Sequence, residues 1–185
     1  MAFIEEDELM DVVDRNDNVI GSAGRDEIHQ KGLCHRSVHV FLVDGQARIY
    51  LQKRTLIKRE HPGRWDSSAS GHVLKGEPYG DAAKRELIEE LGIAAESELK
   101  PVLKMAASAE TGWEHSMLFT VQDAAGRWKP VPNPQEISEG RFFTNREVLD
   151  LFQNAPHTVS PAFRLLFEAY CKARPPVISL SRGCS

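Results

Sequence analysis

The sequence predicts an α/β protein in which a few helices flank a mixed β-sheet, as in an α/β sandwich. The chain has 185 residues, enough for one domain with a sizeable core. Its 41% hydrophobic and 27% charged residues are ordinary for a globular protein. Segments with strand-like alternation are followed by segments with helix-capping residues. We therefore expect one domain over residues 1–174 and a mobile tail over residues 175–185, after Pro175-Pro176 ends the last helix.

The N-terminal half is expected to consist mostly of strands. The turn Asn16-Asp17-Asn18 separates the first two, and Asp44-Gly45 indicates a hairpin. A short helix over residues 25–31 would end at Gly32, and residues 55–63 would form a basic loop. The strands are expected over residues 10–14, 18–22, 35–43, 47–53 and 65–72. Within the third, alternation places one set on each face: Ser37, His39 and Phe41 against Val38, Val40 and Leu42.

The C-terminal half alternates between helices and strands. A helix is expected after Pro78, which suits a first turn, and it would end at Gly92. Residues 101–109 and 113–122 would form an antiparallel pair, followed by a strand over residues 140–143. Asn145 would cap a helix to about residue 152, and Ser160 with Pro161 would start the last helix.

Charge and cysteine content narrow the function classes. A net charge of −4 argues against a nucleic-acid polymer as partner, because such partners need a basic surface. The sequence has no apolar stretch long enough to span a bilayer, so no membrane partner is expected. The three cysteines, Cys34, Cys171 and Cys184, are widely spaced and form no disulfide framework. These features favour a cytoplasmic protein.

The most informative segment is residues 71–93, GHVLKGEPYGDAAKRELIEELGI. Glu86, Glu89 and Glu90 lie three and four residues apart and share one helix face. Like charges at such spacings cost about 0.2–0.5 kcal/mol per pair, so the cluster makes sense if a divalent cation neutralises it. Mg²⁺ prefers hard oxygen ligands and keeps waters that a phosphate can displace. The alternative, a solvated acidic helix, would not need Gly71, Glu77 and Gly92 at fixed offsets.

This segment resembles the Nudix box, Gly-x5-Glu-x7-Arg-Glu-U-x-Glu-Glu-x-Gly-U, where U is aliphatic. Every fixed position matches, namely Gly71, Glu77, Arg85, Glu86, Leu87, Glu89, Glu90, Gly92 and Ile93. The resemblance implies an α/β/α sandwich around a mixed sheet. It also implies a hydrolase that uses Mg²⁺ or Mn²⁺ to cleave a diphosphate linkage. A nucleoside diphosphate derivative is the expected small-molecule substrate.

The roles within the box follow from charge and from the resemblance. Glu86 and Glu90, one helical turn apart, would hold one cation, and Glu89 a second cation or a bound water. By resemblance, the Gly71 carbonyl adds a ligand, and Arg85 pairs with Glu77 to fix the loop to the helix. The general base stays open between Glu86, Glu136 and Glu139, the last two being ordinary solvated carboxylates in the alternative interpretation.

Outside the box, residues 14–41 and 51–72 resemble the Nudix branch that contains isopentenyl-diphosphate isomerase and its hydrolase relatives. That resemblance implies that Arg25, Arg54 and Lys58 contact a diphosphate. The alternative is that all three are surface charges.

The same branch has a histidine-rich metal site. His29, His35, His72 and Glu114 fall at or near its ligand positions, and such a donor set suits Mn²⁺ or Zn²⁺. Two departures are present: the spacing from His29 to His35 is one residue shorter, and Ser116 replaces a further Glu ligand. A histidine is more often structural than ligating, and His39 is expected to be an ordinary packed residue.

Two alternative functions remain at this stage. An isomerase would need the catalytic Cys and Glu that the resemblance places at Ser70 and Ser116, and a serine hydroxyl is a poor proton shuttle. A non-catalytic nucleotide-binding module is the third hypothesis. Homodimers are common among such folds. Four aromatics could stack on a base, although core positions are expected for them: Trp65, Trp113, Phe142 and Phe143.

Overall fold

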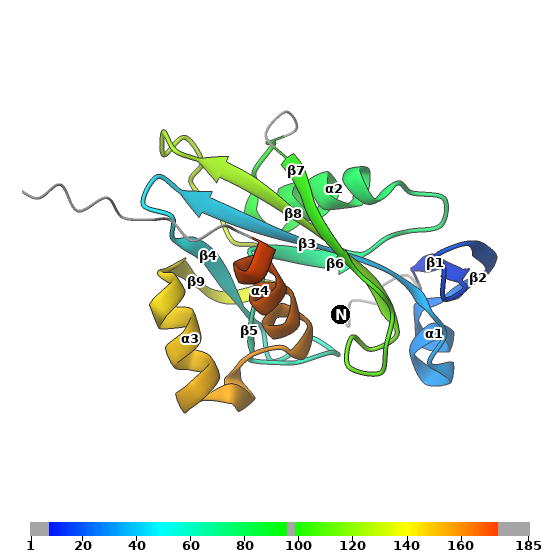
Figure 1. Ribbon diagram of the computed structural model, residues 1–185. Helices are drawn as coiled ribbons and strands as arrows, with labels where there is room; N and C mark the ends of the chain where they lie inside the picture. Colours follow the sequence, from blue (N-terminus) through cyan, green and yellow to red (C-terminus); the bar gives the residue numbers. More distant parts are fainter. Residues whose placement is uncertain (1–7, 96–98, 174–185) are drawn as a thin grey trace, which may run out of the picture.

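The structure is a computed structural model that describes residues 8–95 and 99–173. A mixed sheet lies between helix α2 on one face and helices α3 and α4 on the other (Figure 1). A small two-stranded sheet and helix α1 lie at one end. The helices are α1 (Arg25–Lys31), α2 (Tyr79–Leu91), α3 (Asn145–Asn154) and α4 (Pro161–Ala173). The strands are β1 (Leu9–Val13), β2 (Val19–Gly24), β3 (His35–Asp44), β4 (Ile49–Arg54), β5 (Trp65–Asp66), β6 (Ala69–His72), β7 (Leu99–Met105), β8 (Glu114–Asp123) and β9 (Ile137–Phe143).

Strand β3 organises the main sheet. It runs parallel to β8 from His35↔Glu114 to Asp44↔Asp123, and β7 pairs antiparallel with β8 as predicted. On its other side, β3 pairs with β6 over its first half but with β4 only at Val43↔Ile49. Strand β4 diverges from that point and pairs with β5 and β9. The divergence separates the start of β3 from the end of β4, and side chains from both ends line the cavity described below.

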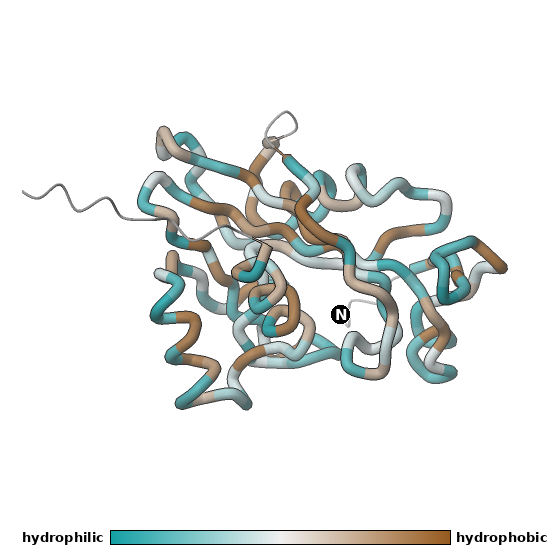
Figure 2. Tube along the Cα trace, viewed as in Figure 1, coloured by the Kyte–Doolittle hydropathy of each residue, from teal (hydrophilic) through white to brown (hydrophobic). Residues whose placement is uncertain are grey.

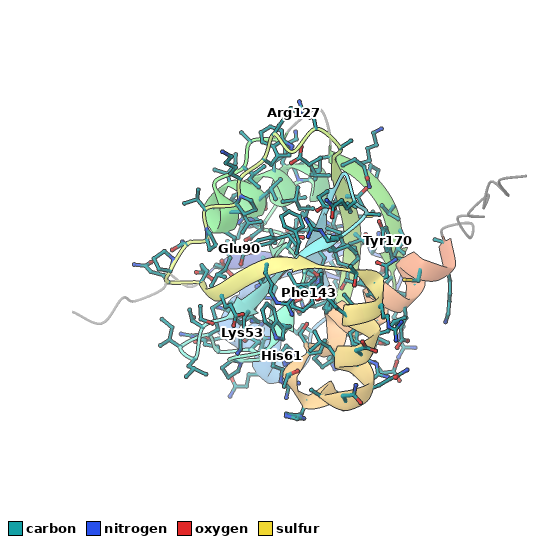
Figure 3. The ribbon with its side chains drawn as sticks, turned by 90° about the vertical axis from the view of Figure 1, so that its left-hand side faces the viewer. Lys53, His61, Glu90, Arg127, Phe143 and Tyr170 are labelled. Carbon is teal, nitrogen blue, oxygen red and sulfur yellow. The ribbon has the colours of Figure 1, made fainter. Side chains whose placement is uncertain are left out.

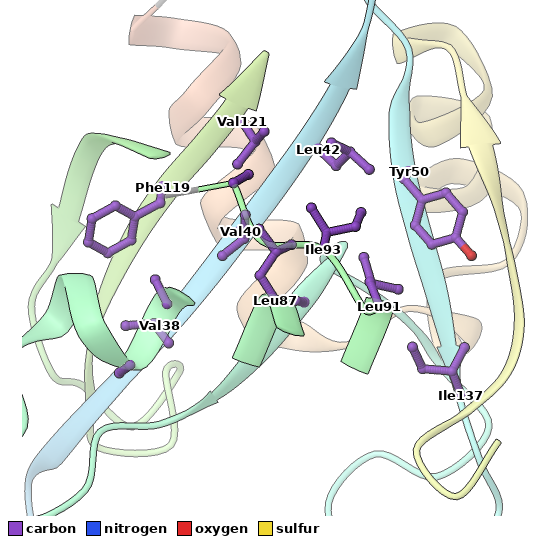
Figure 4. Packing of buried hydrophobic residues seen from close by; sticks show 14 of the residues in the cluster. Val38, Val40, Leu42, Tyr50, Leu87, Leu91, Ile93, Phe119, Val121 and Ile137 are labelled. Atoms are coloured by element: carbon purple, nitrogen blue, oxygen red, sulfur yellow. The ribbon is translucent and has the colours of Figure 1, made fainter. Parts of the chain in front are cut away.

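The two faces of β3 belong to different cores, which confirms the predicted alternation. Val38, Val40 and Leu42 pack with Leu87 and Leu91 of α2 (Figure 4). On the opposite face, Phe41 and Val43 pack with the aromatic side of α4, Phe163, Phe167 and Tyr170. The apolar stretches of β3, β8 and α4 are visible as brown segments inside the molecule (Figure 2). Burying a side chain of this size stabilises the fold by about 1.5–3 kcal/mol, so both layers are firmly attached to β3.

Two helices end at the predicted glycines, and the start of two helices differs from the prediction. Gly32 and Gly92 adopt left-handed φ values of 61° and 67° at the ends of α1 and α2, as predicted. Pro78 is the residue before α2 instead of part of its first turn. The cap of α3 is Thr144, not Asn145: its hydroxyl accepts from Glu147 N at 3.2 Å, and the Glu147 carboxylate accepts from Thr144 N at 2.7 Å. This reciprocal capping box satisfies two end groups, which a single Asn cap does not.

The strand predicted over residues 65–72 is two strands. Between β5 and β6, the Ser68 hydroxyl donates to the Tyr50 carbonyl at 2.5 Å and accepts from Leu42 N at 2.8 Å. These bonds satisfy backbone groups of β4 and β3 where the chain crosses between them. The crossing lets one segment pair first with β4 and then with β3.

Several sequence-based expectations concern the chain outside these elements. The predicted tail and Cys184 lie outside the described residues, whereas Cys34 is a free cysteine. Within residues 8–95 and 99–173, no helix is both long enough and apolar enough to cross a membrane.

Candidate active site

One cavity of about 570 Å³ gathers most of the candidate residues. Its walls come from the acidic face of α2, from α1, β3 and β6, and from the loops over residues 55–64, 106–113 and 124–136. The candidates that line it are Arg25, His29, Arg54, Lys58, Gly71, His72, Glu86, Glu89, Glu90, Glu114 and Glu136. His35 is buried next to His29 and His72. Three residues of the motif lie outside the cavity lining. Arg85 and Glu77 pair with each other, and Gly92 ends helix α2.

Glu86 lies directly against Gly71. A β-carbon built on Gly71 would overlap the Glu86 carboxylate, so the absence of a side chain there makes room for it. Glu86 is buried and accepts from Arg85 Nη1 at 2.6 Å. Burial, aided by the charge of Glu89, raises the pKa of Glu86 to about 7 although Arg85 opposes the shift.

Glu90 is the most buried carboxylate of the α2 cluster. Its Oε2 accepts from Ser70 N at 2.9 Å and from Gln52 Nε2 at 2.8 Å. Figure 3 shows it inside the molecule, behind β9. Burial and the neighbouring Glu86 raise the pKa of Glu90 to about 8. Glu89, in contrast, is 55% exposed, so the helix presents two buried carboxylates and one at the cavity mouth.

Arg85 ties α2 to the preceding loop through the predicted pair with Glu77. Its Nε and Nη2 donate to the two Glu77 oxygens at 3.0 Å each, and Nη2 also donates to the His72 carbonyl at 2.9 Å. Glu77 in turn accepts from Leu74 N at 3.0 Å. Bidentate pairs of this kind fix geometry as well as charge, so the loop that carries Gly71 is held to the ligand helix.

The three histidines form a cluster at the end of β6, where His72 is the last residue of the strand. One ring nitrogen from each of His29, His35 and His72 lies within 4.8 Å of the others. His29 Nε2 and His72 Nε2 are 3.3 Å apart. Glu114 Oε1 is 3.6 Å from His35 Nε2 and 3.7 Å from His72 Nε2. The structure thus brings the predicted second ligand set together.

Charge within this cluster is balanced by protons. Although burial opposes it, contacts with Glu114 and Glu8 raise the pKa of His72 to about 9. Burial likewise opposes the shift at Glu114, yet its contacts with His35 and His72 hold its pKa well below the usual range. His35 Nδ1 bonds the Leu33 carbonyl at 2.9 Å, and its buried Nε2 has no hydrogen-bond partner among the described residues. That nitrogen is directed at the cluster, where a metal would satisfy it.

Each of the three basic candidates has an acidic partner. Arg25 pairs with Glu60, and Lys58 pairs with Glu136. Arg54 Nη1 lies 3.6 Å from Asp66 Oδ2. Arg25 and Arg54 are only 8% and 9% exposed, so neither is the surface charge of the alternative interpretation. Glu139 pairs with Lys53 and lies outside the lining, unlike Glu136.

Ser70 and Ser116, which stand where an isomerase would have its catalytic Cys and Glu, differ in whether they reach the cavity. Ser70 lines the cavity. Ser116 is fully buried and accepts a hydrogen bond from the Ser37 hydroxyl at 2.9 Å. His39 is buried, as predicted, but it also lines the cavity, with Nδ1 2.8 Å from Ser67 Oγ.

Sequence reasoning missed several polar groups of the site, namely Glu8, Gln52, Glu60, His61, Asp66 and Asn133. No local spacing marks them, because they come from several segments that lie far apart in the sequence. The aromatics Trp65 and Phe143 are in the core as expected, whereas Trp113 is 39% exposed.

Comparison with known proteins places the chain in a family. A family model described as the NUDIX domain matches residues 34–164. The chain belongs to the Nudix family. Its fold and α2 segment agree with that assignment, and the family supports an enzyme that acts on phosphoric anhydrides.

Relatives of this Nudix protein carry two kinds of name. An isopentenyl-diphosphate Delta-isomerase 2 of Photorhabdus laumondii is 34% identical over 85% of this chain and 89% of its own. An uncharacterized Nudix hydrolase of Pseudomonas aeruginosa is 33% identical over 88% and 95%. The relatives' names therefore do not separate hydrolysis from isomerisation.

Solved structures share the fold. A Deinococcus radiodurans protein, DR0079, aligns with a TM-score of 0.75 at 24% identity over 91% of this chain and all of its own. The NUDIX domain of Shewanella oneidensis NrtR, solved with ADP ribose, aligns with a TM-score of 0.57 at 13% identity over 74% and 85%.

Proposed function

We propose that this Nudix protein is a divalent-metal-dependent hydrolase that cleaves the diphosphate linkage of a nucleoside diphosphate derivative. The observation that carries the proposal is the pair of buried carboxylates, Glu86 and Glu90, at the wall of a large polar cavity. Buried anions are costly unless they are paired or coordinate a metal. The hydrogen bonds to Glu90 come from neutral groups, Ser70 N–H and the Gln52 amide.

The residues present fit Mg²⁺ or Mn²⁺. Glu86, Glu90 and the Gly71 carbonyl would hold one ion, and Glu89 at the mouth would hold a second ion or a water. All four donors are hard oxygens, which both cations prefer. When bound, such a cation neutralises phosphate oxygens and lowers the pKa of a bound water.

The protein's own groups would position the substrate. Arg25, Arg54 and Lys58 would contact the diphosphate. The two arginines can keep their acidic partners, because a guanidinium has five N–H donors and a carboxylate uses two at most. Glu86 and Glu136 are the candidate bases, and Glu136 would need Lys58 to turn toward the substrate. Arg85 would act by holding the helix and the loop together.

The histidine cluster would hold a second, transition metal. His29, His35, His72 and Glu114 supply nitrogens and one carboxylate, the donor set that suits Mn²⁺ or Zn²⁺. The unpartnered Nε2 of His35 supports this proposal. A cytoplasmic location, the lack of a nucleic-acid or membrane partner and a homodimer stay predictions from the sequence.

Isomerisation of isopentenyl diphosphate is the second candidate. Its support is the 34% identical relative that carries an isomerase name. Ser70 and the buried Ser116 argue against it, because neither hydroxyl titrates near neutral pH. Incubation with isopentenyl diphosphate, followed by analysis for dimethylallyl diphosphate, decides between them.

Substitution of Glu90 tests the hydrolase. Glu90→Gln keeps the shape of the side chain but removes its charge. We expect phosphate or nucleotide release at saturating Mg²⁺ to fall by at least about a hundredfold. Substituting a residue that only supports a metal ligand already lowers metal affinity or activity by about 10- to 100-fold. The matched control is Asp81→Asn, which removes a carboxylate from the solvent face of the same helix, where Asp81 is 59% exposed. Unchanged turnover in Glu90→Gln contradicts the proposal, and tight nucleotide binding without turnover favours the non-catalytic module.

A further inference from the structure

Gln52 places an amide in the buried interior of strand β4. Its side chain is 1% exposed, and its backbone pairs with Asp66 of β5 and with Gly140 of β9. Side chains two residues apart in a strand lie on the same face, and Tyr50 on this face packs in the core beside α2. Burying an amide costs free energy unless the amide is hydrogen-bonded. Packing alone therefore does not account for a glutamine at this position.

The Gln52 side chain has one hydrogen-bond partner among the described residues, and that partner is Glu90. Gln52 Nε2 donates to Glu90 Oε2 at 2.8 Å, and Ser70 N donates to the same oxygen at 2.9 Å. No described residue donates to Glu90 Oε1, and this atom is not sealed off from solvent. Because Glu90 lines the cavity, the oxygen without a donor is the one that reaches it.

Glu86 is also held through one of its two oxygens. Arg85 Nη1 donates to Glu86 Oε1 at 2.6 Å, and no described residue donates to Oε2. The two carboxylates differ in the charge of the donor, because Arg85 is a cation whereas Gln52 and the Ser70 amide are neutral. A neutral donor orients a carboxylate without neutralising it, so the charge of Glu90 remains for a metal ion.

We infer that Gln52 is a positioning residue that, together with the Ser70 amide, holds Glu90 by Oε2 and presents Oε1 to the divalent cation. This inference rests on the proposed hydrolase function and adds to its site a residue from outside the Nudix box. An ionised carboxylate only accepts hydrogen bonds, so the amide nitrogen of Gln52 faces it when the cation is bound. A ligand that is already oriented loses less conformational freedom on binding the metal, which raises the affinity.

Wild-type crystals soaked in Mn²⁺ test which oxygen of Glu90 binds the metal. We expect the ion at bonding distance from Oε1, with Gln52 Nε2 and Ser70 N still within hydrogen-bond distance of Oε2. An ion bound to Oε2, or to both oxygens with Gln52 turned away, overturns this inference and leaves the hydrolase proposal intact. An ion absent from Glu90 contradicts the hydrolase proposal and this inference with it.

Two variants of β4 test the same role in solution. Gln52→Met keeps the length of the side chain and removes its donor. Leu51→Met is the matched control, because it introduces the same residue at the neighbouring buried position, which packs in the core on the opposite face. The affinity for Mg²⁺ is measured by calorimetry without substrate, and Mg²⁺ is used because it prefers oxygen ligands to histidine nitrogens.

We expect Gln52→Met to weaken Mg²⁺ binding by about 10- to 100-fold, the usual effect of losing a residue that orients a metal ligand. Leu51→Met should keep the wild-type affinity. A Gln52→Met protein that binds Mg²⁺ as tightly as the wild type overturns the inference, and a lower temperature of thermal unfolding in that protein would make Gln52 a residue of the fold alone. If Gln52→Met does not fold, the wild-type crystals still decide.

Discussion

The α2 carboxylates and the histidine cluster share one strand but differ in how their charge is balanced. Strand β6 serves both: Ser70 N binds Glu90, Gly71 makes room for Glu86, and His72 belongs to the histidines. Among the histidines, Glu114 and Glu8 face His72, so the proton on His72 has two carboxylate partners. Glu86 and Glu90 repel each other in the interior, and their pKa values rise to about 7 and about 8.

The comparison shows which region depends on a cation. The histidine cluster has a charge-balanced metal-free state, so a metal there must displace protons from His72. The carboxylate cluster reaches such a state at neutral pH only by holding protons on Glu86 and Glu90, because their one charged hydrogen-bond donor among the described residues is Arg85. A hard divalent cation would neutralise these carboxylates, which is why we propose the diphosphate chemistry at α2.

Gly71→Ala should break the carboxylate side of this comparison. The new methyl group would overlap the Glu86 carboxylate, which is the end of a flexible side chain and can move away. We therefore expect hydrolysis to fall by about 10- to 100-fold, as for other disturbed metal sites, while the free energy of unfolding changes by less than about 1 kcal/mol. Kinetics and urea unfolding of the same preparation measure both. A large loss of stability with intact activity would contradict the role given to Gly71.

The pH dependence of Mg²⁺ affinity is a second test of the difference between the two clusters, with a smaller expected effect. The folded-state pKa values of Glu86 and Glu90 lie above their ordinary value of 4.5, so the metal-free fold binds more protons than the unfolded chain. Their contribution to stability is therefore present below about pH 4.5 and is lost as the pH rises through 7 and 8. Because Mg²⁺ displaces these protons, its affinity should rise by up to about tenfold per pH unit and per displaced proton between pH 6 and 8.

Calorimetry in buffers of different ionisation enthalpy measures both the affinity and the released protons. His72→Asn is the control variant, because it changes the histidine cluster and leaves both carboxylates in place. The rise of Mg²⁺ affinity with pH should persist in His72→Asn and should be smaller in Glu90→Gln. A slope that disappears in His72→Asn would assign the protons to the histidines instead.

Local sequence signals predicted most helices and strands, because residues close together in the sequence determine where these elements begin and end. Gly32 and Gly92 end their helices through positive φ, and alternation in β3 separated its two cores. The capping box at Thr144 was missed because Asn145 is also a good cap. The break at Ser67-Ser68 was missed because it depends on bonds to β3 and β4, far away in sequence.

The candidate site was predictable where one helix carries it and less so elsewhere. Spacing alone placed Glu86, Glu89 and Glu90 on one face, and the resemblance added the histidines that the fold brings together. The partners that set their charge, such as Gln52, Glu60 and Asp66, come from separate segments and needed the tertiary structure.

The most direct test is the location of Mn²⁺ in crystals of the wild-type protein soaked in that ion, by anomalous diffraction. The account predicts a peak at bonding distance from both the Glu86 and the Glu90 carboxylates, whether or not a second peak lies among the histidines. A peak among the histidines alone, with the α2 carboxylates free of metal, would contradict it.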